Sequence, residues 1–538
     1  MPKLTIDGIE VEVEEGLNLI QAASRLGIDV PHFCYHPALS VVAQCRQCLV
    51  EVEGVPKVMP ACNTFVREGL IVKTNTEKAV KARKATVEFT LINHPLDCPI
   101  CDKGGECPLQ LTTMKHGPGY SRFEGPEEKK VRRKYYLSDR ILYDPNRCIM
   151  CTRCVRFTDE ITKTGELGFD GRGFRKKIVV FPGKNLDNEL SGNVTDLCPV
   201  GALLNKDNLH EERVWYWKFT DSVCALCSNG CNITVGADPR KGKVSRVRPR
   251  INMDVNEYWI CDRGRYGFRE VQEGGVRLKD PIVRKGEGFE ITDWADAIEL
   301  ASSGLMRAKE MSPNPIAILA SPLLTNEELY LLKKLGAVLK TERVYSNTGD
   351  SSAPKLYGLI SSDPYPNSAG VKDMGILSGP ERIEELINAI TDGQVKILYA
   401  VGEDLFRFGA PDQHARLKEA LAGLTLLIAE DYKLTETVRL AHVILPGASP
   451  YEKEGTFTND RGRVQRVRQT IPPPGTAKPD WEILSLVGAA IEAESLEFRK
   501  PSDIMLEIAG HVPSYSGINY ENIGMLGAER AGHAAFTE

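Results

Sequence analysis

Residues 93–110 read NHPLDCPICDKGGECPLQ and place one histidine and three cysteines within fourteen residues. The spacing is His94-x3-Cys98-x2-Cys101-x5-Cys107, which is typical of a metal-binding loop. Gly104-Gly105 allows this loop to fold back on itself. The preceding stretch, 76–92, carries apolar residues at helical spacing, so we expect a helix that delivers His94 near its end.

The other twelve of the fifteen cysteines form three further sets of four. They read Cys34-x10-Cys45-x2-Cys48-x13-Cys62, then Cys148-x2-Cys151-x2-Cys154-x43-Cys198, then Cys224-x2-Cys227-x3-Cys231-x29-Cys261. With His94 in place of a sixteenth cysteine, every cysteine belongs to a set of four ligands. Four such sets are typical of a chain that carries several iron–sulfur clusters, so the pattern indicates electron transfer.

Zinc is the alternative metal, because four thiolates also suit zinc. Zinc modules usually pair two C-x2-C knuckles, whereas the set that begins at Cys34 has only one. For residues 93–110 the alternative is that His94 is only a loop residue and that three cysteines alone bind the metal. If His94 does bind, its neutral imidazole lowers the negative charge of the cluster and favours the reduced state.

Composition and length limit the remaining possibilities. A chain of 538 residues is expected to form several domains, and a net charge of −5 gives no sign of nucleic-acid binding. No apolar run approaches the roughly 20 residues that span a bilayer, so we expect no direct membrane insertion. The N-terminal residues MPKLTIDGIEVEVEEG follow a strand pattern and not that of a signal peptide. Metal-like cysteine spacing fits a reducing compartment, so we expect the cytoplasm.

Residues 1–78 are expected to fold as a small ferredoxin. Alternating apolar residues on both sides of Asp7-Gly8 predict a hairpin, and 17–26 predict a helix that ends at Gly27. This order resembles the β-grasp of plant-type ferredoxins, although the first cysteine gap is ten residues and not four. It is also similar to the 2Fe–2S domain that begins subunits of complex I, formate dehydrogenase and iron-only hydrogenase. The resemblance implies a 2Fe–2S cluster on the first set.

The third set resembles half of a bacterial two-cluster ferredoxin. Such ferredoxins place a further Cys-Pro after three intervening residues beyond the third cysteine, where this chain has Thr158 and Asp159. The distant half retains only Cys198-Pro199. We therefore expect that one cluster was lost and that one 4Fe–4S cluster remains.

The fourth set resembles the 4Fe–4S module that opens the molybdopterin oxidoreductase fold, with CDRGRYGF at 261–268 as its closing motif. Beyond it, residues 291–301 predict a helix. Apolar runs at 316–321, 395–404, 424–431 and 441–449 predict buried strands of a mostly parallel α/β sheet. The segments EGTFTNDRGRVQ (454–465) and PPPGTAKPDWEIL (472–484) are similar to the late signature of the same fold.

A molybdenum active site in this half is the alternative that the sequence disfavours. No cysteine follows Cys261, the segment is short for such a cofactor, and no recognisable catalytic histidine set is present. We therefore predict a shortened scaffold without molybdopterin. Gly455, Gly462 and Arg463 are then expected to be turn and packing positions.

Taken together, these features resemble the family of large iron–sulfur G subunits of bacterial respiratory complex I. GYSRFEG (119–125), LSGNVTDLCPVGALL (190–204) and VNEYWICDRGR (255–265) carry the likeness. The implied fold is an α+β multidomain chain. Its expected parts are 1–78 (2Fe–2S β-grasp), 79–118 (helical cluster domain with one histidine and three cysteine ligands), 119–217 (4Fe–4S ferredoxin-like), 218–275 (4Fe–4S module), 276–490 (truncated molybdopterin-oxidoreductase-like α/β domain) and 491–538 (C-terminal extension).

The resemblance implies one 2Fe–2S and three 4Fe–4S clusters and an electron relay without a substrate site. Electrons from NADH would pass through the FMN of a flavoprotein subunit, which has its own small 2Fe–2S partner, and enter at the Cys34 set. They would continue to the Cys148 set and the His94 set, and leave for quinone-proximal iron–sulfur subunits. The Cys224 set would lie off this path. The chain would sit peripherally on the cytoplasmic side of the inner membrane.

Two further points stay open on the sequence alone. The chain is shorter than expected for this family, so a soluble NAD-linked hydrogenase or formate dehydrogenase complex is the alternative setting. Arg46, Arg153 and Arg263 lie near ligands in the sequence and are candidates to offset cluster charge. The alternative is that these arginines are solvated or face a partner.

Overall fold

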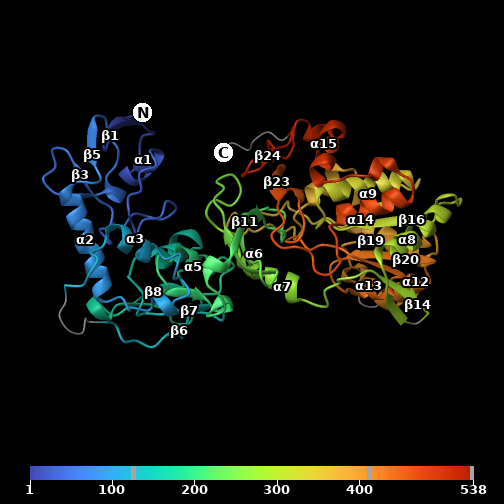
Figure 1. The fold of residues 1–538 in the computed structure, drawn as a ribbon, viewed down its shortest axis with the longest axis horizontal. Helices are drawn as coiled ribbons and strands as arrows, with labels where there is room; N and C mark the ends of the chain where they lie inside the picture. The colour runs from blue at the N-terminus through green and yellow to red at the C-terminus, as the bar shows by residue number, and fades with distance from the viewer. Residues whose placement is uncertain (123–128, 287, 409–412, 533–538) are drawn as a thin grey trace. The chain divides into compact units, whose positions relative to one another are not determined.

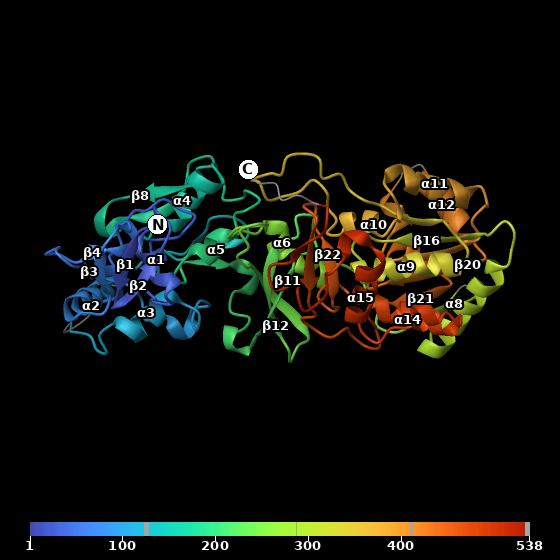
Figure 2. The ribbon, with the colours of Figure 1, turned by 90° about the horizontal axis from the view of Figure 1, so that it is seen from above.

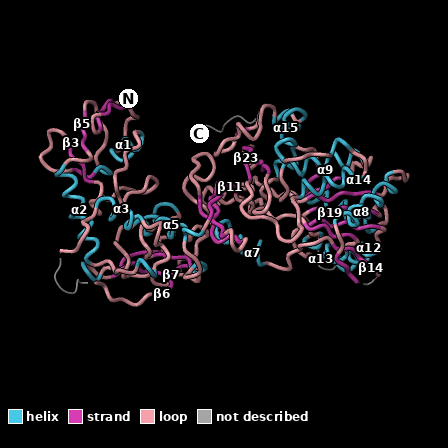
Figure 3. Tube along the Cα trace, in the orientation of Figure 1, coloured by secondary structure: helices cyan, strands magenta, loops and turns pink. Residues whose placement is uncertain are grey.

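The computed structural model describes residues 1–122, 129–286, 288–408 and 413–532. It separates into two compact units, Met1–Trp217 and Lys218–Glu538. Figure 1 and Figure 2 follow the chain in colour through both units, and Figure 3 marks its helices, strands and loops. The last three residues of the GYSRFEG motif and residues 533–538 of the expected C-terminal extension lie outside the described residues.

The first unit begins with a five-stranded sheet in the order β2-β1-β5-β3-β4. β1 pairs antiparallel with β2 and parallel with β5, which is the arrangement expected of a β-grasp. Asp7 and Gly8 have φ of 48° and 86°, so the predicted tight hairpin turn is confirmed. The strands are β1 (Lys3–Ile6), β2 (Ile9–Glu12), β3 (Leu49–Val52), β4 (Met59–Pro60) and β5 (Leu70–Lys73).

A single helix, α1 (Leu19–Arg25), packs its apolar face into this sheet. Asn18 accepts hydrogen bonds from two backbone amides of the first turn, and Gln21 caps Asn18 in return. Gly27 follows the helix with a φ of 70°. The helix predicted over 17–26 is therefore present, slightly shortened by its caps.

The remainder of the first unit is mostly loop with short elements, as Figure 3 shows. The helix predicted over 76–92 is α2 (Glu77–Ile92), which is capped by the Thr76 side chain. The other helices are α3 (Pro108–His116), α4 (Arg153–Arg156) and α5 (Asn193–Leu197). The other strands are β6 (Tyr135–Tyr136), β7 (Ile141–Tyr143), β8 (Leu167–Asp170), β9 (Lys177–Val180) and β10 (Leu203–Asn205).

The second unit opens with a three-stranded antiparallel sheet, β11-β12-β13, followed by two short helices. Their bounds are β11 (Lys218–Val223), β12 (Asn232–Asp238), β13 (Lys243–Pro249), α6 (Asp262–Tyr266) and α7 (Phe268–Glu273).

An eight-stranded sheet forms the centre of the second unit, in the order β15-β14-β21-β20-β19-β16-β17-β18. All pairs from β21 to β18 are parallel, so the predicted mostly parallel α/β sheet is confirmed. The four predicted strands are β16 (Ile316–Ala320), β19 (Ile397–Val401), β20 (Leu426–Asp431) and β21 (Val443–Pro446). The others are β14 (Ile282–Lys285), β15 (Gly288–Ile291), β17 (Val344–Ser346) and β18 (Leu377–Ser378).

Helices cover both faces of this sheet, which explains why its central strands are apolar throughout. One face packs against α8, α9, α14 and α15, and the other against α11, α12 and α13. Figure 1 shows α9 and α14 on one side of β16 and β19, and α13 on the other. The bounds are α8 (Trp294–Lys309), α9 (Asn326–Val338), α10 (Ser368–Asp373), α11 (Pro380–Thr391), α12 (Gln413–Ala422), α13 (Glu436–Leu440), α14 (Asp480–Ala490) and α15 (Pro501–His511).

The described residues after 490 pack into this unit. Ile504, Met505 and Ile508 of α15 are buried in the core beside α9 and α14. β24 (Ala528–Glu529) pairs with β23 (Arg463–Val467), which pairs in turn with β22 (Gly455–Thr458). Among the described residues, no helix combines the length and apolar character needed to cross a membrane.

Candidate metal centres

The ligands predicted from the sequence are considered in their four predicted sets, called sites 1 to 4. Site 1 is Cys34, Cys45, Cys48 and Cys62; site 2 is His94, Cys98, Cys101 and Cys107; site 3 is Cys148, Cys151, Cys154 and Cys198; site 4 is Cys224, Cys227, Cys231 and Cys261. Sites 1 to 3 lie in the first unit, and site 4 lies in the second. No disulfide joins any of these cysteines.

Site 1 consists of two facing pairs of thiols. Cys34 faces Cys45, and Cys48 faces Cys62, while Cys62 also lies within electrostatic range of Cys34 and Cys45. The Cys34 thiol donates to Cys45 and lowers the pKa of Cys45 to about 5, helped by backbone amides that point at the same sulfur. Two pairs of ligands match a 2Fe–2S cluster, in which each iron takes two protein ligands.

The loop of site 1 contains left-handed residues, and backbone amides point at one of its sulfur atoms. Ala43 and Arg46 have φ of 49° and 55°. The Phe33 and Cys34 amides lie 3.4 and 3.5 Å from the Cys45 sulfur. Such N–H···S contacts stabilise negative charge on a ligand and therefore influence the potential of a cluster.

The loop of site 2 follows the end of α2, and His94 lines a pocket together with Cys45 of site 1 and Cys148 of site 3. The amide of His94 donates to the Leu91 carbonyl, which holds the histidine two residues beyond the end of the helix. Gly104 sits against the Cys98 and Cys101 carbonyls, and Gly105 has a φ of 91°, so the two glycines close the loop as predicted. Cys101 and Cys107 are buried, whereas Cys98 is exposed.

His94 is in the state that a metal ligand requires. Burial, followed by the charges of Arg147, Lys130 and Lys129, lowers the pKa of His94 to about 4. The imidazole is therefore neutral near pH 7. Its Nδ1 is buried without a hydrogen-bond partner among the described residues, which is unfavourable unless another group engages it.

Site 3 surrounds a small cavity that all four of its cysteines line. Met150 and Thr152 have φ of 56° and 66°, and the Met150 amide points at the Cys148 sulfur from 3.4 Å. Burial raises the pKa of Cys151 to about 12 in the absence of a metal, since no solvent stabilises the thiolate. A cavity lined by four thiols fits a 4Fe–4S cluster, which replaces the missing solvation of those thiolates.

Thr158 occupies the position of the missing fourth cysteine beside site 3. It is fully buried in a π-helical turn, Phe157–Ile161. Its hydroxyl donates to the Val155 carbonyl and accepts from the Leu167 amide. The side chain is therefore occupied by backbone hydrogen bonds.

Site 4 lies between β11, β12 and the start of α6. Cys224 and Cys231 are joined by a backbone hydrogen bond of 2.9 Å, and Cys231 lies within electrostatic range of the other three cysteines. The Cys261 sulfur caps α6 by accepting the Gly264 amide at 3.3 Å. The Asn229 side-chain amide donates to the Cys231 sulfur at 3.2 Å.

These gatherings are not tight enough to define a mononuclear site. Within the described ranges, no group of three or more His, Cys, Asp or Glu side chains converges on one ion position. The assignment of the sixteen residues as ligands therefore stays a prediction.

Ligand loops of neighbouring sites touch within the first unit. Between sites 1 and 3, the side-chain Nε2 of Gln44 donates to the Met150 carbonyl at 2.6 Å. Between sites 3 and 2, the Cys107 thiol lies 3.6 Å from the carbonyl of Pro199, next to Cys198. Site 3 is therefore a direct neighbour of both other sites.

The three arginines named from the sequence differ in environment. Arg153 is half-buried and donates to the carbonyls of Leu197 and Tyr35, beside ligands of sites 3 and 1. Arg46 and Arg263 are exposed.

Two other arginines, Arg147 and Arg156, are buried beside the sites and were not predicted from the sequence. Cys-x2-Cys spacing locates ligands, but no local pattern distinguishes an arginine that folds against a distant ligand loop. Their proximity to Cys148 and Cys154 in the chain is the one signal that could have singled them out.

The second unit carries buried acids at the carboxyl ends of its central strands. Burial raises the pKa of Glu403, which follows β19, and of Asp431, which ends β20, to about 7 in each case. Lys453 is buried between Glu328 and Asp480, at 2.8 Å from each.

The predicted structural roles of two glycines in this unit agree with their surroundings. Gly462 forms a turn at a φ of 73°, and Gly455 packs against Thr325. Arg463 pairs with Asp254 and Glu529 at 2.9 and 3.0 Å, which fits the packing role expected of it.

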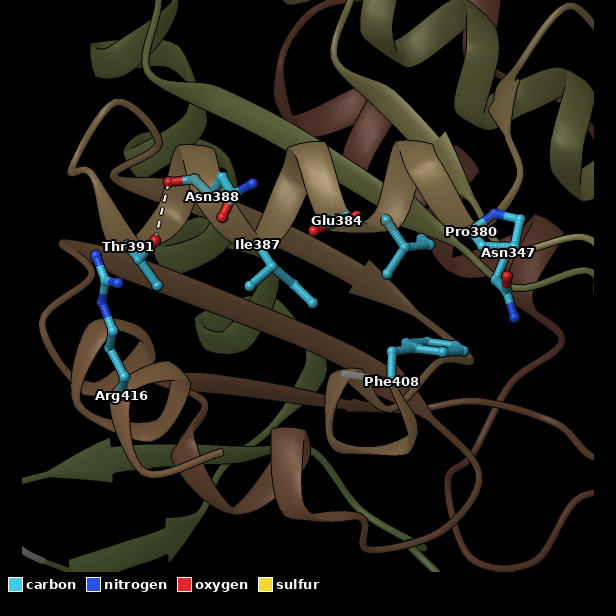
Figure 4. Close-up of a pocket in the computed structure, with 9 residues that line it drawn as sticks. Asn347, Pro380, Glu384, Ile387, Asn388, Thr391, Phe408 and Arg416 are labelled. Atoms are coloured by element: carbon cyan, nitrogen blue, oxygen red, sulfur yellow. Dashed lines mark hydrogen bonds between the residues drawn. The ribbon is translucent and has the colours of Figure 1, made fainter. Parts of the chain in front are cut away.

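A cavity of about 480 Å³ lies between α11 and α12 of the second unit. Figure 4 shows Ile387 and Phe408 along it, Asn388, Thr391 and Arg416 at one end, and Asn347 and Pro380 at the other. None of the sixteen predicted ligands lines it.

Comparison with family descriptions assigns almost the whole chain. Residues 2–77 match a 2Fe-2S iron–sulfur cluster binding domain, and 83–122 match the NADH-ubiquinone oxidoreductase-G iron–sulfur binding region. Residues 138–204 match the ferredoxin-like domain of NADH-quinone oxidoreductase subunit 3. Residues 217–273 match the molybdopterin oxidoreductase Fe4S4 domain, and 277–365 and 365–490 match molybdopterin oxidoreductase itself. The domain order predicted from the sequence is confirmed.

Individual relatives agree with this assignment. The mitochondrial NADH-ubiquinone oxidoreductase 78 kDa subunit of Neurospora crassa is 31% identical, with 97% of this chain and 85% of the relative aligned. That alignment runs over 646 positions, so the relative contains segments that this chain of 538 residues lacks. The G subunit of NADH-quinone oxidoreductase from Rickettsia felis is 39% identical over 62% of this chain and 49% of its own length.

The corresponding protein of Streptomyces coelicolor is 40% identical over 62% of this chain and 39% of the relative. The match thus spans half or less of these two bacterial relatives. Among solved structures, a chain of an NAD+-reducing [NiFe]-hydrogenase in the H2-reduced state is 27% identical, with a TM-score of 0.35. The match covers 40% of this chain and 91% of that one.

Proposed function

Because the chain belongs to the family formed by the NADH–quinone oxidoreductase G subunit and the mitochondrial 78 kDa subunit, we propose that it relays electrons within such an enzyme. The observation that carries the proposal is the contact between the loops of three predicted ligand sets, those of sites 1, 3 and 2, within one unit. In this proposal the chain holds redox groups in place and shields them from solvent, and it has no substrate site of its own.

The residues present fit the groups that the family descriptions imply. The thiol pairs of site 1 suit one 2Fe–2S cluster, and the thiol-lined cavity of site 3 suits a 4Fe–4S cluster. The neutral His94, whose Nδ1 has no partner among the described residues, supports its role as the fourth ligand of a 4Fe–4S cluster at site 2, and site 4 would hold a third. When bound, such clusters supply one-electron carriers.

We propose the order site 1, site 3, site 2 for electron flow, which is the order that the family resemblance implies. Site 3 touches the loops of both neighbours, so a route from site 1 to site 2 through site 3 needs no long gap. Site 4 belongs to the other unit, and we propose that it lies off this route.

The partners in this proposal are other subunits of the same enzyme. An FMN- and NADH-binding subunit with its small 2Fe–2S partner would deliver electrons, and quinone-proximal iron–sulfur subunits would remove them. Through these partners the chain would sit peripherally on the cytoplasmic side of the membrane.

The second unit does not suit molybdopterin. Ligands of open parallel sheets bind outside the carboxyl ends of the strands. In this chain that edge carries Glu403, Glu430 and Asp431, all buried. Burial raises the pKa of all three carboxyl groups, and such groups provide no positive charge to bind a phosphate-bearing cofactor. We therefore propose that this fold serves as scaffold.

Metal analysis of anaerobically purified protein tests the proposal. One two-iron and three four-iron clusters require about 14 irons per chain. Reduction with dithionite should then produce distinct electron paramagnetic resonance (EPR) signals at low temperature. Stoichiometric zinc with little iron, or stoichiometric molybdenum, would refute the assignment.

A further inference from the structure

Two buried arginines link the ligand loop of site 3 to the loops of its two neighbours. Arg147 and Arg156 are 2% and 7% exposed, respectively. Arg147 directly precedes the ligand Cys148, and Arg156 lies two residues after the ligand Cys154. Each guanidinium reaches away from site 3 to a different site.

Arg156 joins site 3 to site 1. Its Nη2 donates to the carbonyl of the ligand Cys34 at 2.5 Å and to that of the ligand Cys151 at 3.4 Å. Its Nη1 donates to the Ser40 carbonyl, and its Nε donates to the Thr152 hydroxyl at 3.3 Å. One planar group therefore holds a ligand residue of each site.

Arg147 joins site 3 to site 2. Its Nε donates to the carboxylate of Asp97 at 3.1 Å, and its Nη2 lies 3.0 Å from the same oxygen. Asp97 directly precedes the ligand Cys98 and begins the short turn Cys98–Ile100. Asp144, 3.3 Å from Nε, holds the guanidinium from the site 3 side.

Arginine suits this role because its five donors lie in a rigid plane and can hold several acceptors at once. Burying a guanidinium is costly unless hydrogen bonds and negative charge compensate. The four oxygens to which Arg156 donates are neutral. The thiolates of sites 1 and 3 would supply the compensating negative charge when they bind metal.

We infer that Arg156 and Arg147 are positioning residues, Arg156 fixing the spacing of sites 1 and 3, and Arg147 that of sites 3 and 2. The inference rests on the proposed function, since it concerns the distances along the proposed electron route. Arg156 should therefore affect only the spacing of sites 1 and 3, and Arg147 only that of sites 3 and 2.

The test compares Arg156→Lys and Arg147→Lys in the anaerobically purified full chain. Lysine keeps the charge but cannot bridge two loops as a planar fork does. Arg213→Lys is the matched control, because Arg213 donates to the carbonyls of Cys101 and Pro99, both in the site 2 loop alone. The readout is the magnetic interaction between reduced clusters, measured by EPR relaxation, beside the iron content.

We expect Arg156→Lys to weaken the interaction between sites 1 and 3, whose loops Gln44 and Arg153 still join, and to retain that between sites 3 and 2. Arg147→Lys should show the reverse, and Arg213→Lys should retain both. Wild-type interactions in Arg156→Lys and Arg147→Lys, or the same weakening in both, would overturn the inference. Absence of iron from the wild-type chain would instead refute the proposed function.

Hydrogen exchange of the iron-free chain keeps the inference testable if a variant fails to load iron. Arg156→Lys should speed amide exchange in residues 33–48 and 150–156 and leave 98–107 unchanged. Arg147→Lys should speed exchange in 98–107 and leave 33–48 unchanged. Uniform acceleration in both variants would overturn the inference, since it would indicate general loosening.

Discussion

Gly201→Ala should abolish the cluster at site 2 while sparing the others. Gly201 follows the site 3 ligand Cys198 by three residues, yet a Cβ at this position would lie 2.2 Å from the sulfur of Cys101 in site 2. Gly201 is not among the residues with left-handed φ, so alanine adds crowding without backbone strain.

The size of the effect follows from this distance. Real Cβ atoms essentially never approach other heavy atoms within 3.0 Å, so the methyl and the sulfur must separate by at least 0.8 Å, from 2.2 to 3.0 Å. Metal–ligand distances tolerate only about 0.2 Å of change. Buried Lys103, whose Cβ is 3.3 Å from the added methyl, limits relaxation on that side. Overpacking of this kind also costs about 1–3 kcal/mol of stability.

Iron analysis and EPR of the reduced protein provide the assay. The iron content should fall from about 14 to about 10 per chain as one four-iron cluster is lost, while the signals of the other sites persist. Gly119→Ala is the control, because within the described residues no atom lies within 4 Å of its added Cβ. Full iron content and an unchanged site 2 signal in Gly201→Ala would refute the reasoning.

Three further predictions concern single side chains. His94→Cys should keep a cluster at site 2 and lower its potential, because a thiolate adds negative charge; an unchanged potential in redox titration would show that His94 is not a ligand. Burial raises the pKa of Asp431 to about 7. Below about pH 4 the carboxyl is protonated in both the folded and the unfolded chain, and as the pH rises through 7 the folded state loses stability because the buried group must ionise. Asp431→Asn should therefore stabilise the second unit at pH 8 relative to wild type, by up to about 4 kcal/mol, and have little effect near pH 4 in urea unfolding; an equal gain at both values would contradict this. Lys453→Met should destabilise the second unit by about 3–5 kcal/mol, because it leaves Glu328 and Asp480 buried without their cation; a loss below about 1 kcal/mol in the same assay would count against it.

The sequence by itself determined the features that depend on local spacing. Cysteines two or three residues apart define ligand loops, because a short loop can wrap only a nearby metal. Asp7-Gly8 between alternating runs determined the first hairpin, and uninterrupted apolar runs marked the strands covered on both faces. The β-grasp and the parallel sheet followed from these signals.

Only the tertiary structure decided which sites are neighbours and what holds them together. Arg156 reaches Cys34 across more than a hundred residues, and Gly201 meets Cys101 across a similar separation, so no periodicity in the sequence reports either contact. The short strands β17 and β18 and the packing of α15 into the second unit likewise depend on partners distant in the chain. Local spacing predicts ligands and specifies elements, whereas the positions of the predicted sites depend on long-range packing.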